Sequence, residues 1–241
     1  MPSAPAVAAP RSRRQIEHRL NPSSLRHVVF DLDGTLVDSR ADLAAAVNAG
    51  LAALGYAALR EAQIVSFIGN GTGRLVARAL DAAAGPAAAG EEMLPFFHEY
   101  YASHLLDRTC LYAGIVELLA ALQSSGVRVS VLTNKNEGHS RAILRGLALD
   151  GLVGDVIGGD TLGVFKPDPA GLHWLVQASE VPAHRTAMVG DSVVDMEVAR
   201  RAAVVGFGVA WGFGASEALL AAGAEQILQR PGELQPACVL S

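Results

Sequence analysis

The sequence contains only two cysteines among its 241 residues, Cys110 and Cys238. Two thiols are too few for the disulfide framework of a small secreted protein, and neither lies in a motif typical of a reactive cysteine. We therefore expect both cysteines to be reduced thiols and the protein to be cytoplasmic.

Long apolar runs and an excess of positive charge are also lacking. No hydrophobic segment reaches the roughly 20 residues that cross a bilayer, which argues against a membrane protein. The formal net charge of −5 disfavours nucleic acid as the main partner, although local basic residues can still bind a small anion. With 51% hydrophobic residues the chain is globular, and its length fits one α/β domain with or without a smaller inserted one.

The first 25 residues have no core-forming pattern. They are rich in Pro, Ala, Ser and Arg and include Arg11-Ser12-Arg13-Arg14. A targeting peptide is one interpretation, but a continuous apolar segment is missing. We predict that residues 1–25 form a disordered, solvated tail.

Between residues 40 and 110 the sequence has helical periodicity and no strand-like alternation. We therefore predict an all-helical inserted domain over residues 39–111. Gly69-Asn70-Gly71-Thr72-Gly73 is expected to be a turn between two of its helices. The expected helices run from about Arg40 to Leu54, Glu61 to Phe67, Arg74 to Ala83 and Glu91 to Leu106.

From Tyr112 onward, helix and strand patterns alternate, which is typical of a parallel sheet covered by helices. Residues 26–38 and 112–241 are therefore predicted to form a doubly wound (Rossmann-like) α/β core domain with a parallel sheet. The expected strands lie at 28–30, 127–132, 156–157, 186–189, 204–209 and 226–228.

Polar side chains that suit phosphoryl transfer follow four of these strands. They are Asp31 and Asp33, Thr133 and Asn134, Lys166, and Asp191 with Asp195. The carboxyl ends of parallel strands form one ligand crevice, so these groups are expected to lie close together. Carboxylates suit a hard cation such as Mg²⁺, a hydroxyl and an amide can hold oxygens, and a carboxylate can attack phosphorus.

Four motifs give the chain a resemblance to a known family. They are Asp31-Leu32-Asp33-Gly34-Thr35, Leu132-Thr133-Asn134-Lys135, Lys166-Pro167-Asp168-Pro169 and Val189-Gly190-Asp191-Ser192 with Asp195. In this order and spacing they resemble the phosphatases of the haloacid dehalogenase (HAD) superfamily, most closely its phosphoglycolate phosphatases, over residues 27 to 235. The resemblance implies a HAD core with a helical cap and Mg²⁺-dependent hydrolysis of a small phosphorylated metabolite, with 2-phosphoglycolate as the expected substrate.

The resemblance also implies roles for the strand-end residues. Asp31 would be the nucleophile that becomes an aspartyl phosphate, and Asp33 would be the general acid and then the general base. Mg²⁺ would be held by Asp31, the main-chain carbonyl of Asp33, and Asp191. Thr133 and Asn134 would hold phosphate oxygens, Lys166 would neutralise the phosphate and the nucleophile, and Asp195 would support the metal site or Lys166.

In the predicted cap, the loop that contains Gly71 would face the substrate, and Arg74 could bind a substrate carboxylate. An ordinary turn with a solvated arginine is an equally good interpretation. Elsewhere we expect Asp38 and Asp42 to cap or solvate the helix near Arg40, and His139 to lie on a helix surface. Trp211-Gly212-Phe213-Gly214 could border the site, as the matching loop does in the family that the chain resembles, but we interpret them as turn and packing residues.

Several alternatives stay open. Within the enzymes they are a phosphatase for another small phosphate ester or sugar phosphate, a phosphosugar mutase and a phosphonate hydrolase; a dehalogenase is disfavoured because Asp33 suits protonation of a leaving group. From other classes come a phospho-accepting receiver domain, which needs no long helical insert, and a non-catalytic binding protein. A monomer or a homodimer is expected.

Overall fold

The computed structural model of the chain describes residues 25–234. The predicted tail and Cys238 lie outside these residues, apart from Leu25, which is buried in the core one residue before the predicted start of the α/β unit. Cys110 is an exposed free thiol.

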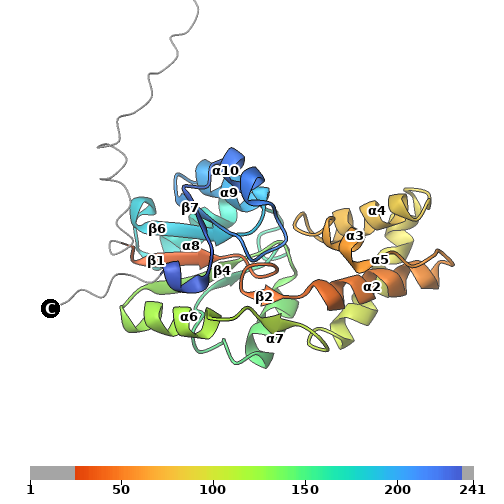
Figure 1. Cartoon of the computed structure of the whole chain (residues 1–241), viewed down its shortest axis with the longest axis horizontal. Coiled ribbons are helices and arrows are strands. Elements are labelled where there is room, and N and C mark those ends of the chain that lie inside the picture. The colour runs from red at the N-terminus through yellow and green to blue at the C-terminus, as the bar shows by residue number, and fades with distance from the viewer. Residues whose placement is uncertain (1–24, 235–241) are drawn as a thin grey trace, which may run out of the picture.

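A six-stranded parallel sheet lies at the centre of the molecule, with the strand order β5-β4-β1-β6-β7-β8 (Figure 1). Its strands are β1 (His27–Phe30), β4 (Arg128–Leu132), β5 (Val156–Ile157), β6 (Thr186–Gly190), β7 (Val205–Val209) and β8 (Gln226–Leu228). The wholly buried β1 pairs with β4 and β6, so that Phe30 is opposite both Val131 and Val189. Residues that directly follow these three strands are thereby brought to one edge of the sheet.

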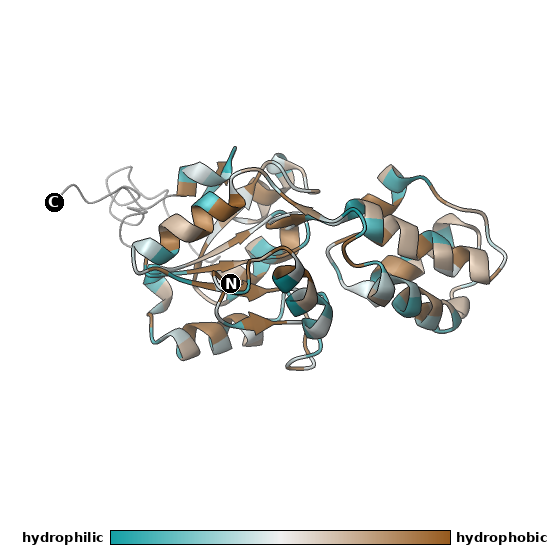
Figure 2. Ribbon diagram, turned by 90° about the horizontal axis from the view of Figure 1, so that it is seen from below, coloured by the Kyte–Doolittle hydropathy of each residue, from teal (hydrophilic) through white to brown (hydrophobic). Residues whose placement is uncertain are grey.

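Helices cover both faces of the sheet, as expected for a doubly wound fold. One face packs on α6 (Ile115–Ser124) and α7 (Glu137–Gly146), and the other on α8 (Ala170–Ser179) and α9 (Val193–Arg201), beside which lies α10 (Ser216–Ala222). Two 3₁₀ turns, η2 (Ala183–Arg185) and η3 (Pro231–Leu234), complete the core. Side chains of β1 alternate between the faces, which is why the strand reads as a continuous apolar run. Figure 2 shows these apolar strands enclosed between the helices.

A separate helical bundle lies beside the sheet (Figure 1). Its helices are α2 (Arg40–Ala53), α3 (Glu61–Val65), α4 (Thr72–Ala82) and α5 (Ala89–Ser103). They enclose a second hydrophobic cluster, in which α2 packs closely on α5. Gly50 allows this approach, because a Cβ there would lie 2.9 Å from the Met93 side chain. The helices agree with the predicted ones except at their ends.

A short antiparallel ribbon joins the two chain segments that link the sheet to the bundle. It consists of β2 (Val37–Asp38) and β3 (Cys110–Leu111), which the sequence analysis did not anticipate. Next to it, the buried Asp42 of α2 accepts hydrogen bonds from the Arg108 and Thr109 amides and from Thr109 Oγ1, at 2.7 to 3.1 Å. The expectation that Asp42 caps or solvates its helix is wrong, because its carboxylate binds the opposite linker.

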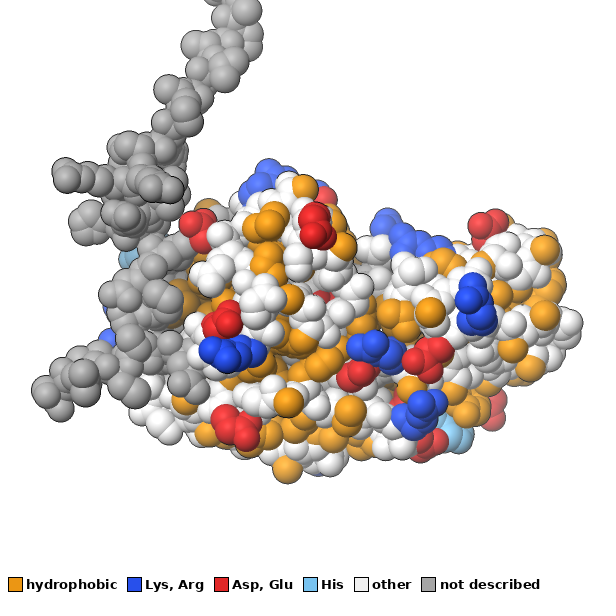
Figure 3. Space-filling model, in the orientation of Figure 1, with side chains coloured by type: hydrophobic (Ala, Val, Ile, Leu, Met, Phe, Trp, Pro, Cys, Tyr) orange, Lys and Arg blue, Asp and Glu red, His pale blue; other side chains and the backbone are white. Residues whose placement is uncertain are grey.

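Within residues 25–234 no helix has the length and apolar character needed to cross a membrane. On the face shown in Figure 3, acidic and basic side chains are interspersed over both the sheet unit and the helical bundle.

Candidate active site

Asp31 is the first residue after the central strand, at the carboxyl edge of the sheet. Its Oδ1 accepts a hydrogen bond from the Leu32 amide at 2.7 Å and pairs with Lys166 Nζ at 2.9 Å. Burial raises the pKa of Asp31 to about 7; Lys166 opposes the rise, whereas the nearby carboxylates of Asp195 and Asp33 add to it. Additional positive charge near Asp31 would therefore stabilise the ionised form of its carboxylate.

Lys166 lies in the loop after β5, buried between two acids. Its Nζ is 2.6 Å from Asp195 Oδ1 as well as 2.9 Å from Asp31. Burial alone would lower the pKa of Lys166, but Asp195 and Asp31 raise it above the usual lysine value, so the side chain stays protonated. The peptide bond between Lys166 and Pro167 is cis.

Asn134 holds the main chain of this lysine. Its Oδ1 accepts from the Lys166 amide at 2.7 Å, and its Nδ2 donates to the Lys166 carbonyl at 3.1 Å. The sequence analysis expected Asn134 to hold phosphate oxygens, which stays a prediction; in the structure both ends of its side-chain amide are engaged by Lys166. The structure therefore gives this side chain a positioning role.

Asp195 lies in the first turn of α9, with both carboxylate oxygens engaged. Oδ1 pairs with Lys166, and Oδ2 accepts from the amide and hydroxyl of Ser192 in a capping box. Asp195 is thus fixed by the start of its own helix, and it orients Lys166 toward Asp31.

Asp191 follows β6 and is closely enclosed by backbone. A Cβ at Gly34, which has a φ of +82°, would clash with the Asp191 carboxylate, and one at Gly212 would clash with its side chain. The Phe213 amide donates to Asp191 Oδ2 at 2.7 Å. The loop after β7 therefore borders the site, which is the alternative that we ranked second for Trp211–Gly214; its glycines beside a strand end were the signal.

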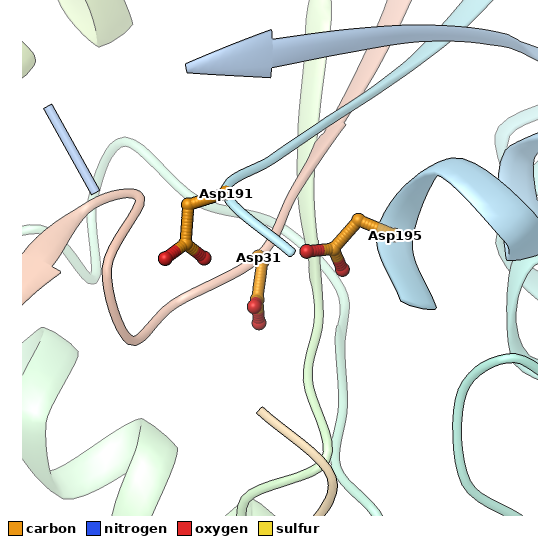
Figure 4. Close-up of side chains that lie close together, drawn as sticks. All are labelled: Asp31, Asp191 and Asp195. Carbon is orange, nitrogen blue, oxygen red and sulfur yellow. The ribbon is translucent and has the colours of Figure 1, made fainter. Parts of the chain in front are cut away.

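Three carboxylates meet at this edge of the sheet (Figure 4). They belong to Asp31, Asp191 and Asp195, and one oxygen of each lies within 4.8 Å of the others. Burial, together with Asp31 and Asp195, raises the pKa of Asp191 well above its usual value. A buried group of oxygen donors with unbalanced negative charge fits a hard divalent cation.

Asp33 is bound by a lysine that the sequence analysis left without a role. Lys135 Nζ contacts Asp33 Oδ1 at 2.9 Å and Oδ2 at 2.7 Å, and the Ser39 hydroxyl donates to Oδ1 at 2.6 Å. Lys135 directly follows Thr133 and Asn134 and is 8% exposed. Burial alone would lower the pKa of Lys135, but Asp33 is the main cause of a net rise, so the lysine is a cation.

A small cavity of about 50 Å³ lies between the sheet edge and the helical bundle. The sheet side contributes Asp31, Asp33, Thr133, Asn134 and Lys135, and the bundle contributes Gly71, Leu75, Phe97 and Tyr101, among others. The Gly69 carbonyl accepts from Asn134 Nδ2 at 3.2 Å, which connects the two sides. The cavity therefore joins the predicted nucleophile to side chains of the inserted helices.

Two residues near the cavity bear on expectations from the sequence. Arg74 is exposed on α4 and is not among the described residues that line the cavity, which fits the interpretation as a solvated arginine. His139, expected on a helix surface, is half-buried, lines the cavity and meets the Tyr101 ring edge-on, with 5.7 Å between the ring centroids. Gly71 lines the cavity.

Comparison with known proteins places this geometry in context. The family described as haloacid dehalogenase-like hydrolase matches residues 28–209. The phosphoglycolate phosphatase of Rhodospirillum rubrum is 44% identical over 183 residues, covering 73% of this chain and 76% of the relative. That of Vibrio parahaemolyticus is 34% identical over 218 residues, covering 87% and 94%. The crystal structure of a predicted phosphoglycolate phosphatase from Haemophilus somnus has a TM-score of 0.82 at 28% identity, covering 88% and 96%.

Proposed function

The chain belongs to the haloacid dehalogenase-like hydrolase family, and we propose that it is a phosphatase that hydrolyses 2-phosphoglycolate to glycolate and phosphate. The observation that carries the reaction class is the position of Asp31, which is paired with Lys166 and lies within a group of buried acids at the sheet edge. The substrate is inferred from the relatives, whose name is phosphoglycolate phosphatase.

In the proposed reaction, an Asp31 oxygen attacks phosphorus, and the bond between phosphorus and the glycolate oxygen breaks. Asp33 gives a proton to the departing oxygen and later takes a proton from the attacking water. That water breaks the bond between phosphorus and Asp31, which releases phosphate. Lys166 balances the charge of Asp31 and the phosphoryl group throughout, and the Thr133 hydroxyl contacts a phosphoryl oxygen.

We further propose that Mg²⁺ is bound by Asp31, Asp191 and the main-chain carbonyl of Asp33. The ion would supply the positive charge that allows one anion to approach another. Support for this site comes from the donor set alone: buried oxygen ligands, with the pKa values of Asp31 and Asp191 raised by burial and by neighbouring carboxylates.

The helical bundle is proposed to be a cap domain over residues 39–111, with the core domain formed by residues 26–38 and 112–241. The cap would exclude water from the site and select the substrate. Two contacts support this role, the Asn134–Gly69 hydrogen bond and the position of Tyr101 against Lys135. A cytoplasmic location and a monomeric or homodimeric state stay predictions from the sequence.

The proposal is tested by phosphate release from a panel of small phosphate esters, with and without Mg²⁺, using the Asp31→Asn variant to control for contaminating phosphatases. We expect 2-phosphoglycolate to exceed the other esters in kcat/KM by orders of magnitude. If a different ester has the highest kcat/KM, the substrate is another small phosphate ester or sugar phosphate. Transfer of phosphate to a second sugar instead of water would favour a mutase.

A further inference from the structure

Lys135 is a buried cation for which the reaction steps above have no use. Among the described residues that line the cavity it is the only lysine or arginine. The same cavity contains the nucleophile Asp31 and the phosphate-binding Thr133. A small substrate held by its phosphoryl group at Asp31 therefore extends into the space in which Lys135 lies.

Tyr101 is a second residue of the cavity lining whose polar group the reaction steps do not use. The residue is 2% exposed, and its buried hydroxyl donates to no acceptor among residues 25–234; the polar group beside it is the Lys135 ammonium, which can only donate. Its ring stacks on Phe97 with 5.6 Å between the ring centroids, and Lys135 Nζ lies 4.7 Å from the Tyr101 centroid. A buried hydroxyl that donates to no acceptor is costly, so a ligand atom that accepts its hydrogen bond would stabilise this arrangement.

We propose that Lys135 and Tyr101 bind the carboxylate of the substrate, and so select phosphate esters that carry a second negative charge. This inference rests on the proposed function, because it assigns the carboxylate end of 2-phosphoglycolate. The ammonium group has three N–H donors, so it can bind a substrate carboxylate while it remains close to Asp33. The apolar side chains of Leu75 and Phe97 lower the local polarity and strengthen this pairing.

Other cations near the cap are less suitable. Arg78 borders a second cavity on the Asp191 side, but its guanidinium donates to the Phe67 carbonyl and to Asn70 Oδ1. Arg74 lies outside the lining of the main cavity. His139 does line it, but burial, with Lys135 as the second cause, lowers its pKa and favours the neutral ring.

The test compares two esters that differ at one end, 2-phosphoglycolate and 2-hydroxyethyl phosphate, in which a neutral alcohol replaces the carboxylate. For Lys135→Met we expect kcat/KM to fall about 10- to 100-fold more for 2-phosphoglycolate than for 2-hydroxyethyl phosphate, mainly through KM, the loss expected for one charged hydrogen bond. Tyr101→Phe should give a smaller selective loss, and Lys135→Arg should retain the preference for the carboxylate. Arg74→Ala is the matched control and should leave the ratio of the two esters unchanged.

Binding provides a readout that does not need turnover. In the Asp31→Asn background, calorimetry with each ester should show that Lys135→Met weakens the binding of 2-phosphoglycolate more than the binding of 2-hydroxyethyl phosphate. Equal losses for both esters would overturn the subsite, since Lys135 would then act only through Asp33; a selective loss in Arg74→Ala instead would move the subsite to α4. If the wild type fails to hydrolyse 2-phosphoglycolate at all, the proposed function itself is rejected.

Discussion

The ammonium group of Lys135 contacts both carboxylate oxygens of Asp33, at 2.9 and 2.7 Å. The two residues lie 102 positions apart in the sequence, and they meet because β1 and β4 are neighbours in the parallel sheet. Lys135, which follows β4, therefore places a positive charge beside Asp33, which follows β1. The predictions about the site depend on similar contacts between residues far apart in the sequence.

Replacing the nucleophile should abolish turnover. In Asp31→Asn, the amide cannot form the phosphoryl bond and no longer pairs as an anion with Lys166, so we expect kcat to fall by at least about 10³-fold. Phosphate release from 2-phosphoglycolate measures this loss, and circular dichroism checks that the variant is folded. Hydrolysis within tenfold of the wild type would reject Asp31 as the nucleophile.

Removal of metal should abolish activity and lower stability together. Chelation leaves the carboxylates of Asp31 and Asp191 to repel each other, so we expect Mg²⁺ to raise the Tm of the wild type in a concentration-dependent way. In Asp191→Asn both the activity and this rise in Tm should be largely lost. An unchanged Mg²⁺ effect on Tm in that variant would show that the ion binds elsewhere.

Asn134 should affect the reaction through Lys166. Asn134→Ala removes two hydrogen bonds to the Lys166 main chain, so we expect a loss of roughly 1 to 3 kcal/mol in the free energy of unfolding. Since Lys166 would be less well positioned, kcat should fall by about tenfold or more while KM changes little. A change confined to KM would instead support a direct contact between Asn134 and the substrate.

The buried His27 should make the protein less stable in acid. Burial, with Arg128 as the second cause, lowers the pKa of His27 from 6.5 to about 4, so the folded state favours the neutral ring. The unfolded state binds the proton more readily, and stability should therefore fall as pH drops from about 6.5 to about 4, by about 3 kcal/mol. In the folded state the His27 ring also has a hydrogen-bond contact with Ser130, whose hydroxyl lies 2.9 Å from Nε2.

Urea unfolding of the wild type and of His27→Gln at pH 7.5 and 4.5 checks this prediction. Other acids also titrate in this range, so the informative quantity is the difference between the two proteins. Its change between the two pH values should be about 2 to 3 kcal/mol, and parallel pH profiles would contradict the assignment to His27.

Asp42 should stabilise the connection between the sheet and the helical bundle. Asp42→Ala leaves the Arg108 and Thr109 amides and the Thr109 hydroxyl without their acceptor, and we expect a loss of roughly 2 to 4 kcal/mol. Faster limited proteolysis near residues 104–109 would be the direct sign, with Asp38→Ala, on the more exposed side of the ribbon, as the control. Equal proteolysis of both variants would argue against this role.

The sequence allowed the sheet, the helical insert and the strand-end residues to be predicted, because each depends on a local pattern. Asp31 and Asp191 directly follow apolar strands, and parallel strands must bring such residues to one edge. These local patterns do not show which side chains pair with one another across the fold. Lys135 with Asp33, Asp42 with Thr109, and Phe213 with Asp191 are all long-range pairs.

The same limit explains what the sequence analysis left out. The resemblance implied that Asn134 holds phosphate oxygens, but no local pattern shows that its side-chain amide is bound by a loop 32 residues away. The strands β2 and β3 have two residues each, too few for an alternating pattern to be visible. Arg74 was left with two interpretations, because its charge and its position after a glycine turn do not determine which way its helix faces.

The ribbon of β2 and β3 has a consequence for how this architecture can evolve. Because Val37 pairs with Leu111, the inserted bundle starts and ends at one point of the core. A long segment whose two ends are already held together can be lengthened, shortened or replaced with little further entropic cost to the core. The insert and the sheet can therefore change separately, so that the proposed cap can alter its choice of substrate while the residues at the strand ends stay the same.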